Sequence, residues 1–293
     1  MLRPEAARRA AVKEARRLAR EAARRARLER HREQRATASI DGAPETVALD
    51  HPHHEVRLLV TSSMEREWRA HSCAKEPWTV AWLEESMRDG GVLYDIGANT
   101  GAFSLLAAKI AGPGGTIVAV EPGYASYARL CDNVVLNGVQ DRVFPVPFAL
   151  SETIGVATLT YNTLQPGQSR HQFAQDEWVR RSASQQTRYS QPVLTVTLDA
   201  LIDQFAMPRP RHIKLDVDGA ELAVLRGAGN TLRSPDLSSI LIEIDDTLSE
   251  AAVGWLASHG FVLDTRHKRV HGEKTQVWYG VFRRSATIAT SVA

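Results

Sequence analysis

The chain has 293 residues, 43% of them hydrophobic, so it can bury a core as one large domain or two small ones. Its two cysteines, Cys73 and Cys131, lie far apart and outside any CxxC motif, which argues against a disulfide framework and a zinc site. No run approaches the roughly 18 apolar residues of a membrane span, and no apolar secretory segment opens the chain. These features predict a cytoplasmic protein without a membrane span.

The net charge of +2 combines two oppositely charged parts. Residues 1–37 contain 13 lysines and arginines against five glutamates, a net +8, which leaves −6 for the remainder. Their composition favours a helix, but only Val12, Leu18 and Leu28 could form an apolar stripe. This basic tail is therefore either a solvated helix or a contact to an acidic partner such as nucleic acid or acidic lipid.

Residues 38–54 have the composition of a linker, because glycine and proline interrupt them and no apolar face develops. His51, His53 and His54 lie there, but nothing nearby supplies a rigid fourth metal ligand. We assign these histidines no role and predict no metal site.

Residues 55–284 are the expected folded body, with 285–293 as a short tail. Strands and helices are predicted to alternate in it, as strand 56–61, helix 77–88, strand 91–96, helix 103–110, strand 116–121, helix 124–137, strands 142–150, 154–161 and 192–196, helix 198–205, strand 212–217, helix 219–225, strand 239–244, helix 250–259 and strands 261–263 and 276–282. This order implies a mostly parallel sheet covered on both faces, with ligands beyond the carboxyl ends of its strands. A polar insertion, 162–191, interrupts the pattern.

The most informative segment, 95–101, joins the strand at 91–96 to the next helix and contains Asp95, Gly97, Asn99 and Gly101. Glycines let the backbone approach a ligand closely. The spacing is DxGxxxG, whereas the dinucleotide fingerprint is GxGxxG, in which a pyrophosphate lies on the helix N-terminus. Asp95 places negative charge at that position, so we expect a cationic ligand such as S-adenosylmethionine, which carries an ammonium and a sulfonium.

A second acid, Glu121, closes the next strand and is followed by Pro122. Its carboxylate is placed to accept both hydroxyls of a ribose; the alternative is an acid that caps the helix beginning near Tyr124. Together with the glycine turn, Glu121 predicts an adenosyl ligand. Ala149 and Leu150, at the end of a further strand, are expected to line the same site.

Five motifs then occur in an order and spacing that resemble the FkbM family of S-adenosylmethionine-dependent methyltransferases. They are 95–101 (DIGANTG), 120–122 (VEP), 197–199 (TLD), 213–221 (IKLDVDGAE) and 224–228 (VLRGA). The resemblance extends over about residues 76–282. It departs from the family pattern at Asp218, where glutamate is usual, and at Thr100, where isoleucine or valine is common.

This resemblance implies the class I methyltransferase fold, which is Rossmann-like, with a seven-stranded, mostly parallel sheet, a final antiparallel strand and helices on both faces. It also implies O-methylation of a hydroxyl on a small-molecule or glycan acceptor, namely a sugar, a lipid or a secondary metabolite, with S-adenosylmethionine as cofactor. The insertion at 162–191 is either a lid over the acceptor or a disordered segment.

Side chains alternate along an extended segment, so Lys214, Asp216 and Asp218 are expected on one side. We predict Asp216 as the general base or the acceptor-orienting group, with Asp218 and Glu221 shaping the acceptor pocket. Lys214 would keep the carboxylates ionised, or act as the base if burial lowers its pKa. In the alternative, Lys214 and Glu221 form only a structural pair.

Other interpretations stay open. Asp216 with Glu243 or Asp245 could bind Mg²⁺, although no ligand spacing demands it. A nicotinamide oxidoreductase would use the same sheet, but Asp95 argues against a pyrophosphate. A non-catalytic adaptor could dock through residues 1–37, and that tail also permits a nucleic-acid methyltransferase, for which no base-stacking motif is present.

Overall fold

The computed structural model describes residues 44–62, 65–161, 166–167, 172–174, 189–268 and 277–285. The basic tail at 1–37 and most of the insertion and of the C-terminal tail lie outside the described residues. None of the helices described is both long and apolar enough to span a bilayer.

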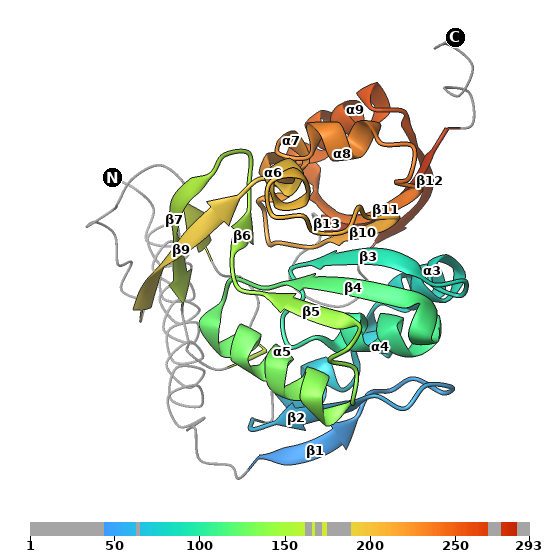
Figure 1. The fold of residues 1–293 in the computed structure, drawn as a ribbon, viewed down its shortest axis with the longest axis vertical. Helices are drawn as coiled ribbons and strands as arrows, with labels where there is room; N and C mark the ends of the chain where they lie inside the picture. Colours follow the sequence, from blue (N-terminus) through green and yellow to red (C-terminus); the bar gives the residue numbers. More distant parts are fainter. Residues whose placement is uncertain are drawn as a thin grey trace, which may run out of the picture. The chain divides into compact units, whose positions relative to one another are not determined.

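The central sheet has seven strands in the order β12-β13-β11-β10-β3-β4-β5. They are β3 (Gly91–Ile96), β4 (Gly115–Val120), β5 (Val143–Val146), β10 (His212–Leu215), β11 (Ser239–Asp245), β12 (Phe261–Lys268) and β13 (Val277–Arg284). Strands β3, β4, β5, β10 and β11 pair in parallel, and β13 runs antiparallel to both of its neighbours. This arrangement confirms the predicted class I methyltransferase sheet (Figure 1).

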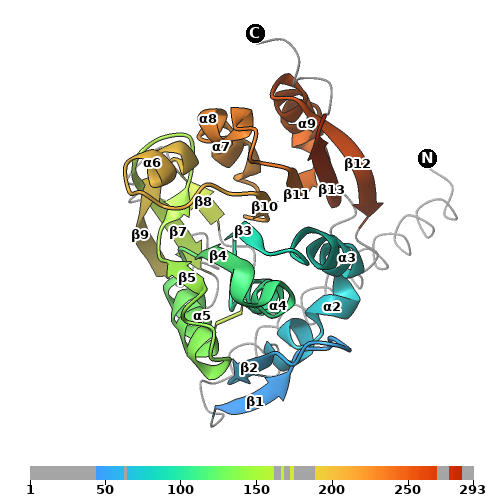
Figure 2. The same cartoon turned by 45° about the vertical axis from the view of Figure 1, so that its right-hand side comes forward.

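Helices cover the sheet on both faces (Figures 1 and 2). On one face lie α3 (Pro77–Ser86), α4 (Ala102–Ala111) and α5 (Tyr124–Leu136), and on the other α6 (Leu198–Asp203), α7 (Glu221–Arg226), α8 (Gly229–Arg233) and α9 (Ser249–Ser258). The sequence of β3 is almost wholly apolar because both faces of the strand are buried. Leu93 packs into the core beneath α3, α4 and α5, and Tyr94 packs into the core on the opposite face. Strands buried on both faces appear as continuous hydrophobic runs.

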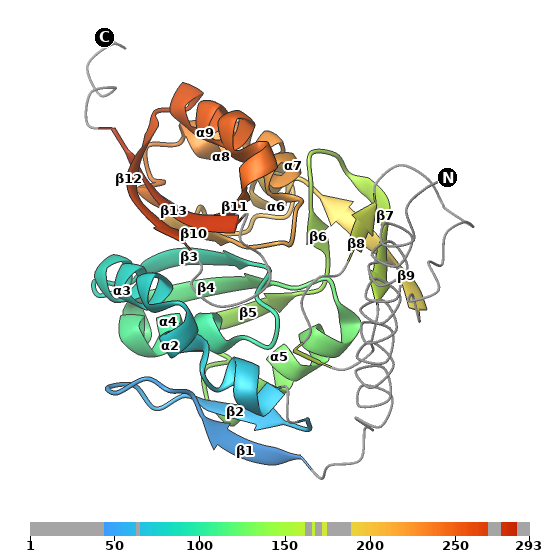
Figure 3. The same cartoon turned by 180° about the vertical axis from the view of Figure 1, so that it is seen from behind.

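A smaller sheet stands beside the central one, with the order β6-β9-β7-β8 (Figure 3). Its strands are β6 (Ala149–Leu150), β7 (Gly155–Tyr161), β8 (Gln172–Ala174) and β9 (Tyr189–Val196). The prediction of one strand over 142–150 is therefore wrong, because this stretch divides between two sheets. The chain leaves the central sheet after Val146, and Ala149 and Leu150 pair with β9 instead.

The predicted linker at 38–54 is also wrong in part, because it contains β1 (Glu45–Ala48), which pairs antiparallel with β2 (Arg57–Val60). His51 closes this hairpin. Its buried ring accepts backbone N–H groups from two and three residues further on, at 3.3 and 3.1 Å, and its Nε2 lies 3.3 Å from a carboxylate oxygen of Glu84. The histidine without an assigned role is thus a structural residue.

Short elements complete the described fold. They are η1 (Glu65–Arg69), a π-helical turn, α2 (Ser72–Lys75), and two 3₁₀ turns, η2 (Gly112–Gly114) and η3 (Asp246–Leu248).

Candidate active site

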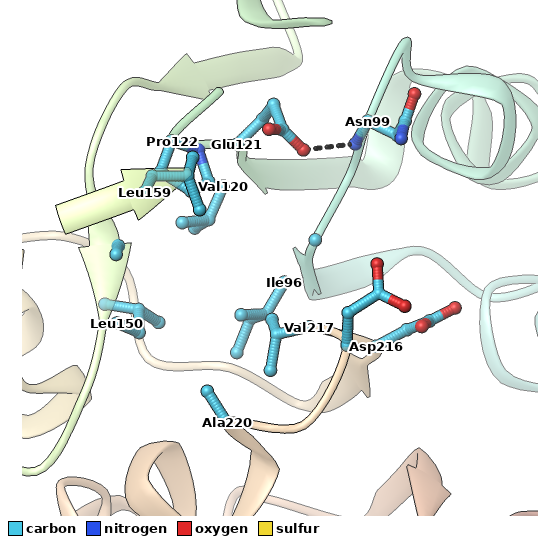
Figure 4. A pocket seen from close by; sticks show the side chains of 13 residues that line it. Ile96, Asn99, Val120, Glu121, Pro122, Leu150, Leu159, Asp216, Val217 and Ala220 are labelled. Atoms are coloured by element: carbon cyan, nitrogen blue, oxygen red, sulfur yellow. Dashed lines mark hydrogen bonds between the residues drawn. The ribbon is translucent and has the colours of Figure 1, made fainter. Parts of the chain in front are cut away.

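A pocket opens at the carboxyl ends of β3, β4 and β10 (Figure 4). The space between its walls is about 640 Å³, part of which is open solvent. Eight of the twelve predicted site residues line it, namely Gly97, Asn99, Glu121, Pro122, Ala149, Leu150, Asp216 and Asp218. The other four, Asp95, Gly101, Lys214 and Glu221, are not among its lining residues.

The pocket has a polar and an apolar side. Apolar side chains of Val120, Leu150 and Leu159 lie across it from the carboxylate of Asp216 (Figure 4). Such an apolar wall can pack against the flat face of a nucleobase, while the carboxylates bind the polar part of the same ligand.

The glycines of the turn are needed first for packing within the protein. Gly97 has a φ of 85°, and a Cβ there would lie 1.8 Å from the carbonyl oxygen of Asp216. Gly101, with a φ of 91°, leaves no room for a Cβ, which would lie 2.5 Å from Leu130 Cδ1. The turn was located correctly from sequence. Its two glycines are needed because the backbone passes close to Asp216, just after β10, and to Leu130 of α5.

Glu121 fastens the two loops that border the pocket. One carboxylate oxygen accepts the N–H of Asn99 at 2.9 Å, and the other accepts the N–H of Gly123 at 2.7 Å. Asn99 adopts the left-handed conformation, φ 52°, that aims its N–H at the carboxylate. Gly123 is the N-cap of α5, but no side-chain hydrogen bond caps this helix, so Glu121 fixes the turn before α5 and does not act as its cap. Each oxygen keeps a second lone pair that a ribose hydroxyl could use.

Lys214 and Asp95 form a buried ion pair below the glycine turn. The ammonium lies 3.4 Å from Asp95 and 3.6 Å from Asp216, and Ser104 donates a 2.5 Å hydrogen bond to Asp95. The side chains of Lys214 and Asp95 are only 3% and 1% exposed. The charge of Asp95 is therefore balanced by Lys214 inside the protein, so Asp95 does not supply the negative charge from which a cationic ligand was predicted.

The same pairing removes Lys214 as a candidate base. Burial disfavours its ammonium, but the charges of Asp95, Asp216 and Glu76 outweigh burial and raise the pKa of Lys214 above its usual value. Lys214 thus remains a cation that fixes the carboxylates.

Glu221 pairs with backbone and not with Lys214, so the alternative of a Lys214–Glu221 structural pair is wrong. Its Oε1 accepts the N–H groups of Val217 and Gly219, both at 3.1 Å. These bonds stabilise the turn in which Asp218 holds a left-handed φ of 55°. Glu221 shapes the pocket indirectly, through this turn.

A family model that describes the FkbM methyltransferase domain matches residues 95–265, more than half of the chain. The chain belongs to the FkbM methyltransferase family. It is thus a methyltransferase, and S-adenosylmethionine is its cofactor.

Relatives of this FkbM methyltransferase extend the comparison. The hexuronic acid methyltransferase AglP of Haloferax volcanii is 26% identical over 186 residues, which cover 64% of this chain and 69% of AglP. The 31-O-demethyl-FK506 methyltransferase FkbM of Streptomyces tacrolimicus is 29% identical over 199 residues, 60% of this chain and 75% of the relative. A crystal structure of methyltransferase FkbM from Methylobacillus flagellatus aligns with a TM-score of 0.45 and 15% identity, over 66% of this chain and 44% of that one.

The pocket of this FkbM methyltransferase fits S-adenosylmethionine in its donor set. Glu121 offers two carboxylate oxygens for a ribose diol, and the apolar wall beside Leu150 and Leu159 suits an adenine. Asp216 and Asp218 also line the pocket, and their carboxylates could meet the cationic end of the cofactor.

The Mg²⁺ interpretation gains no support. Tyr279 donates a 2.6 Å hydrogen bond to Glu243, and Asp245 accepts the N–H and hydroxyl of Thr247 at 2.9 and 2.6 Å. Within the residues that the structure describes, no group of three or more histidine, cysteine or acidic side chains is arranged to hold a metal.

Two features of the site were missed from sequence. Gln191, at the end of the insertion, donates a 3.2 Å hydrogen bond to the carbonyl of Pro122 and also contacts Tyr161. Arg69, the last residue of η1, lies close enough to Glu121 and Asp216 for their charges to act on it. Neither residue belongs to a recognisable motif, and only tertiary packing brings them here.

Glu121 should make stability depend on pH. Burial raises the pKa of Glu121 from 4.5 to about 7, against the opposing backbone hydrogen bonds. The folded state therefore binds this proton more tightly than the unfolded state, so its contribution to stability is present below pH 4.5 and is lost as pH rises through 7. Relative to Glu121→Gln, we expect the wild-type free energy of unfolding to fall by on the order of 2–3 kcal/mol between pH 4.5 and 8. Urea denaturation of both proteins across this window measures it, and parallel pH profiles would contradict it.

Proposed function

We propose that this methyltransferase transfers the methyl group to a hydroxyl oxygen of a small acceptor, either a sugar or a secondary metabolite alcohol. Two observations support the acceptor class: AglP is named for hexuronic acid, and the Streptomyces relative for the 31-O position of FK506. The observation that carries the proposal is the Asp216 carboxylate, which lines the pocket beside the buried Lys214 ammonium.

The chemistry asks little of the protein beyond alignment and proton removal. S-adenosylmethionine, when bound, supplies a methyl group already activated by its sulfonium. Asp216 would orient the acceptor hydroxyl and accept its proton, since its side chain is 22% exposed at the pocket while Lys214 holds one of its oxygens at 3.6 Å. The Asp218 and Glu221 turn would shape the space for the acceptor. Alignment is worth roughly 7–11 kcal/mol and a positioned base about 10²- to 10⁴-fold, so positioning should dominate.

Asp216→Asn should therefore lower the turnover number by about 10²- to 10⁴-fold while S-adenosylhomocysteine affinity changes only a few-fold. The asparagine keeps the shape of the side chain but loses its capacity to accept a proton. Single-turnover transfer and calorimetry measure the two effects separately, and Asp203→Asn, at an exposed carboxylate paired with Arg209, is the control. Unchanged turnover would remove Asp216 from the base role.

The acceptor class is tested with methyl-labelled S-adenosylmethionine and a panel of uronic acid sugars, neutral sugars, macrocyclic alcohols and lipids, with products identified by mass spectrometry. We expect label on a hydroxyl oxygen. Label on nitrogen or carbon would contradict the proposal. Binding of S-adenosylhomocysteine without transfer to any acceptor would favour the adaptor interpretation.

Docking of the basic tail on an acidic partner, and a cytoplasmic location, stay predictions. If methyl transfer survives deletion of residues 1–37, the tail acts outside the reaction.

A further inference from the structure

Helix α5 holds the free edge of β2 through a ladder of side chains one turn apart, namely Arg129, Asn133 and Asn137. Asn137 accepts the N–H of Arg57 at 2.9 Å and donates to its carbonyl at 2.7 Å. Asn133 accepts the N–H of Leu59 at 2.7 Å, and Arg129 donates to the Leu59 carbonyl at 2.6 Å. Residues four apart share one face of a helix, so the ladder fixes β2 along α5.

The ladder also ties this N-terminal segment to the glycine turn and to η1. Asn133 donates a 2.9 Å hydrogen bond to the carbonyl of Thr100, inside the turn. Arg129 forms a buried 2.9 Å ion pair with Glu65, the first residue of η1. Glu65 is only 1% exposed and accepts the N–H of Thr61 at 2.8 Å. The π-helical turn that ends at Arg69 therefore has a fixed position relative to the pocket.

The Arg69 side chain is itself anchored near the start of α5. Its Nε donates to the carbonyl of Gly167 at 2.8 Å, and Nη2 contacts the same oxygen. Gly167 in turn donates 3.3 Å to the hydroxyl of Ser126, in the first turn of α5, and Gly123 just before that helix bonds to Glu121. This chain of contacts holds the guanidinium against the start of α5, the helix that follows Glu121.

Burial lowers the pKa of Arg69, and the charges of Glu76, Asp216, Glu121 and Asp218 oppose this effect. Three of these acids, Asp216, Glu121 and Asp218, line the pocket, so Arg69 lies near the pocket wall although it is not itself a lining residue. Among the described residues, no hydrogen bond engages its Nη1 group. Lys214, the other cation beside these acids, is buried and already paired with Asp95 and Asp216.

We propose that Arg69 binds the carboxylate of the amino-acid part of the methyl donor. A pocket lined by acids repels a carboxylate unless a cation meets it, and Arg69 offers the fork of donors that suits one. This inference rests on the proposed function, because it assigns a residue to the same cofactor.

Ligand truncation combined with mutation provides the test. Calorimetry would compare S-adenosylhomocysteine, which has the amino-acid part, with 5′-methylthioadenosine, which lacks it. We expect Arg69→Gln to weaken S-adenosylhomocysteine by about 10- to 100-fold and to change 5′-methylthioadenosine by less than about twofold. Arg69→Lys should fall between. Arg209→Gln, which removes an exposed arginine paired with Asp203, is the control for net charge and should leave both affinities unchanged.

Unaltered 5′-methylthioadenosine binding also reports that the Arg69→Gln variant is folded. Equal weakening of both ligands, or no weakening of either, would overturn the role of Arg69. Equal affinity of the wild type for both ligands would overturn it too, and would leave the proposed function intact. Wild-type protein that binds neither ligand would instead refute the cofactor site as a whole.

Discussion

Gly97→Ala should lower the free energy of unfolding by at least about 3 kcal/mol and abolish S-adenosylhomocysteine binding. The new Cβ would lie 1.8 Å from the carbonyl oxygen of Asp216 and 2.9 Å from its carbon, both backbone atoms that no side-chain rotation can move. Relief requires β3 and β10 to separate at the pocket, where Gly97, Asp216 and Asp218 all line the wall. Urea denaturation and calorimetry measure the two losses.

Gly138→Ala is the matched control for this variant. Gly138 also has a positive φ, 62°, but a Cβ there would meet nothing within 4 Å. Its cost should be only the backbone strain, about 1–2 kcal/mol, with binding retained. Equal effects of the two substitutions would show that strain, and not the contact with Asp216, makes Gly97 necessary.

Lys214→Met should destabilise the fold by about 3–5 kcal/mol, because it leaves the Asp95 carboxylate buried without its cation. Asp95 is 1% exposed, and its other partner, Ser104, cannot supply charge. Methionine has a similar length, so lost packing contributes little. Chemical denaturation gives the difference directly.

A double variant identifies the cause. Lys214→Met combined with Asp95→Asn removes both charges, and the asparagine can still accept the hydrogen bond of Ser104. We expect the double variant to recover more than half of the loss, as a coupling energy in a double-mutant cycle. Additive losses would mean that Lys214 stabilises the fold through packing and not through its charge.

The central sheet could be predicted because its strands are buried on both faces and therefore stand out as apolar runs. Gly91–Ile96 and Ser239–Asp245 are examples, and their bounds agree with the prediction to within a residue. The acids at the strand ends were equally visible, because Glu121 and Asp216 each interrupt such a run.

The sequence could not predict side-chain contacts between neighbouring strands, because these depend on the order of the strands in the sheet. Lys214 lies beside Asp95 because β10 is adjacent to β3, in a register that pairs these two residues. The alternation of side chains along a single strand predicts the face of the sheet on which Lys214 lies, but not the residue beside it on the next strand. The two alternatives for Lys214, a base and a pair with Glu221, were therefore wrong, whereas its position beside the carboxylates agrees with the role of keeping them ionised.

The N-terminal contribution was hidden for a different reason. The strand predicted at 56–61 was visible because Leu58 and Val60 are apolar, and both are buried in the core. Its partners were not visible: β1 lies in the predicted linker, the side chains of Asn133 and Asn137 hold β2 along α5, and the segment that holds Arg69 is polar and short. The same limit explains why Gln191 was missed at the pocket rim.

The central claim is that the pocket between β3, β4 and β10 holds the adenosyl cofactor. A crystal structure of the complex with S-adenosylhomocysteine tests this claim most directly. We predict the ribose hydroxyls within hydrogen-bond distance of the Glu121 carboxylate and the sulfur on the Asp216 side of the pocket. An empty pocket at saturating ligand, or one that takes NADH in place of S-adenosylhomocysteine, would contradict it.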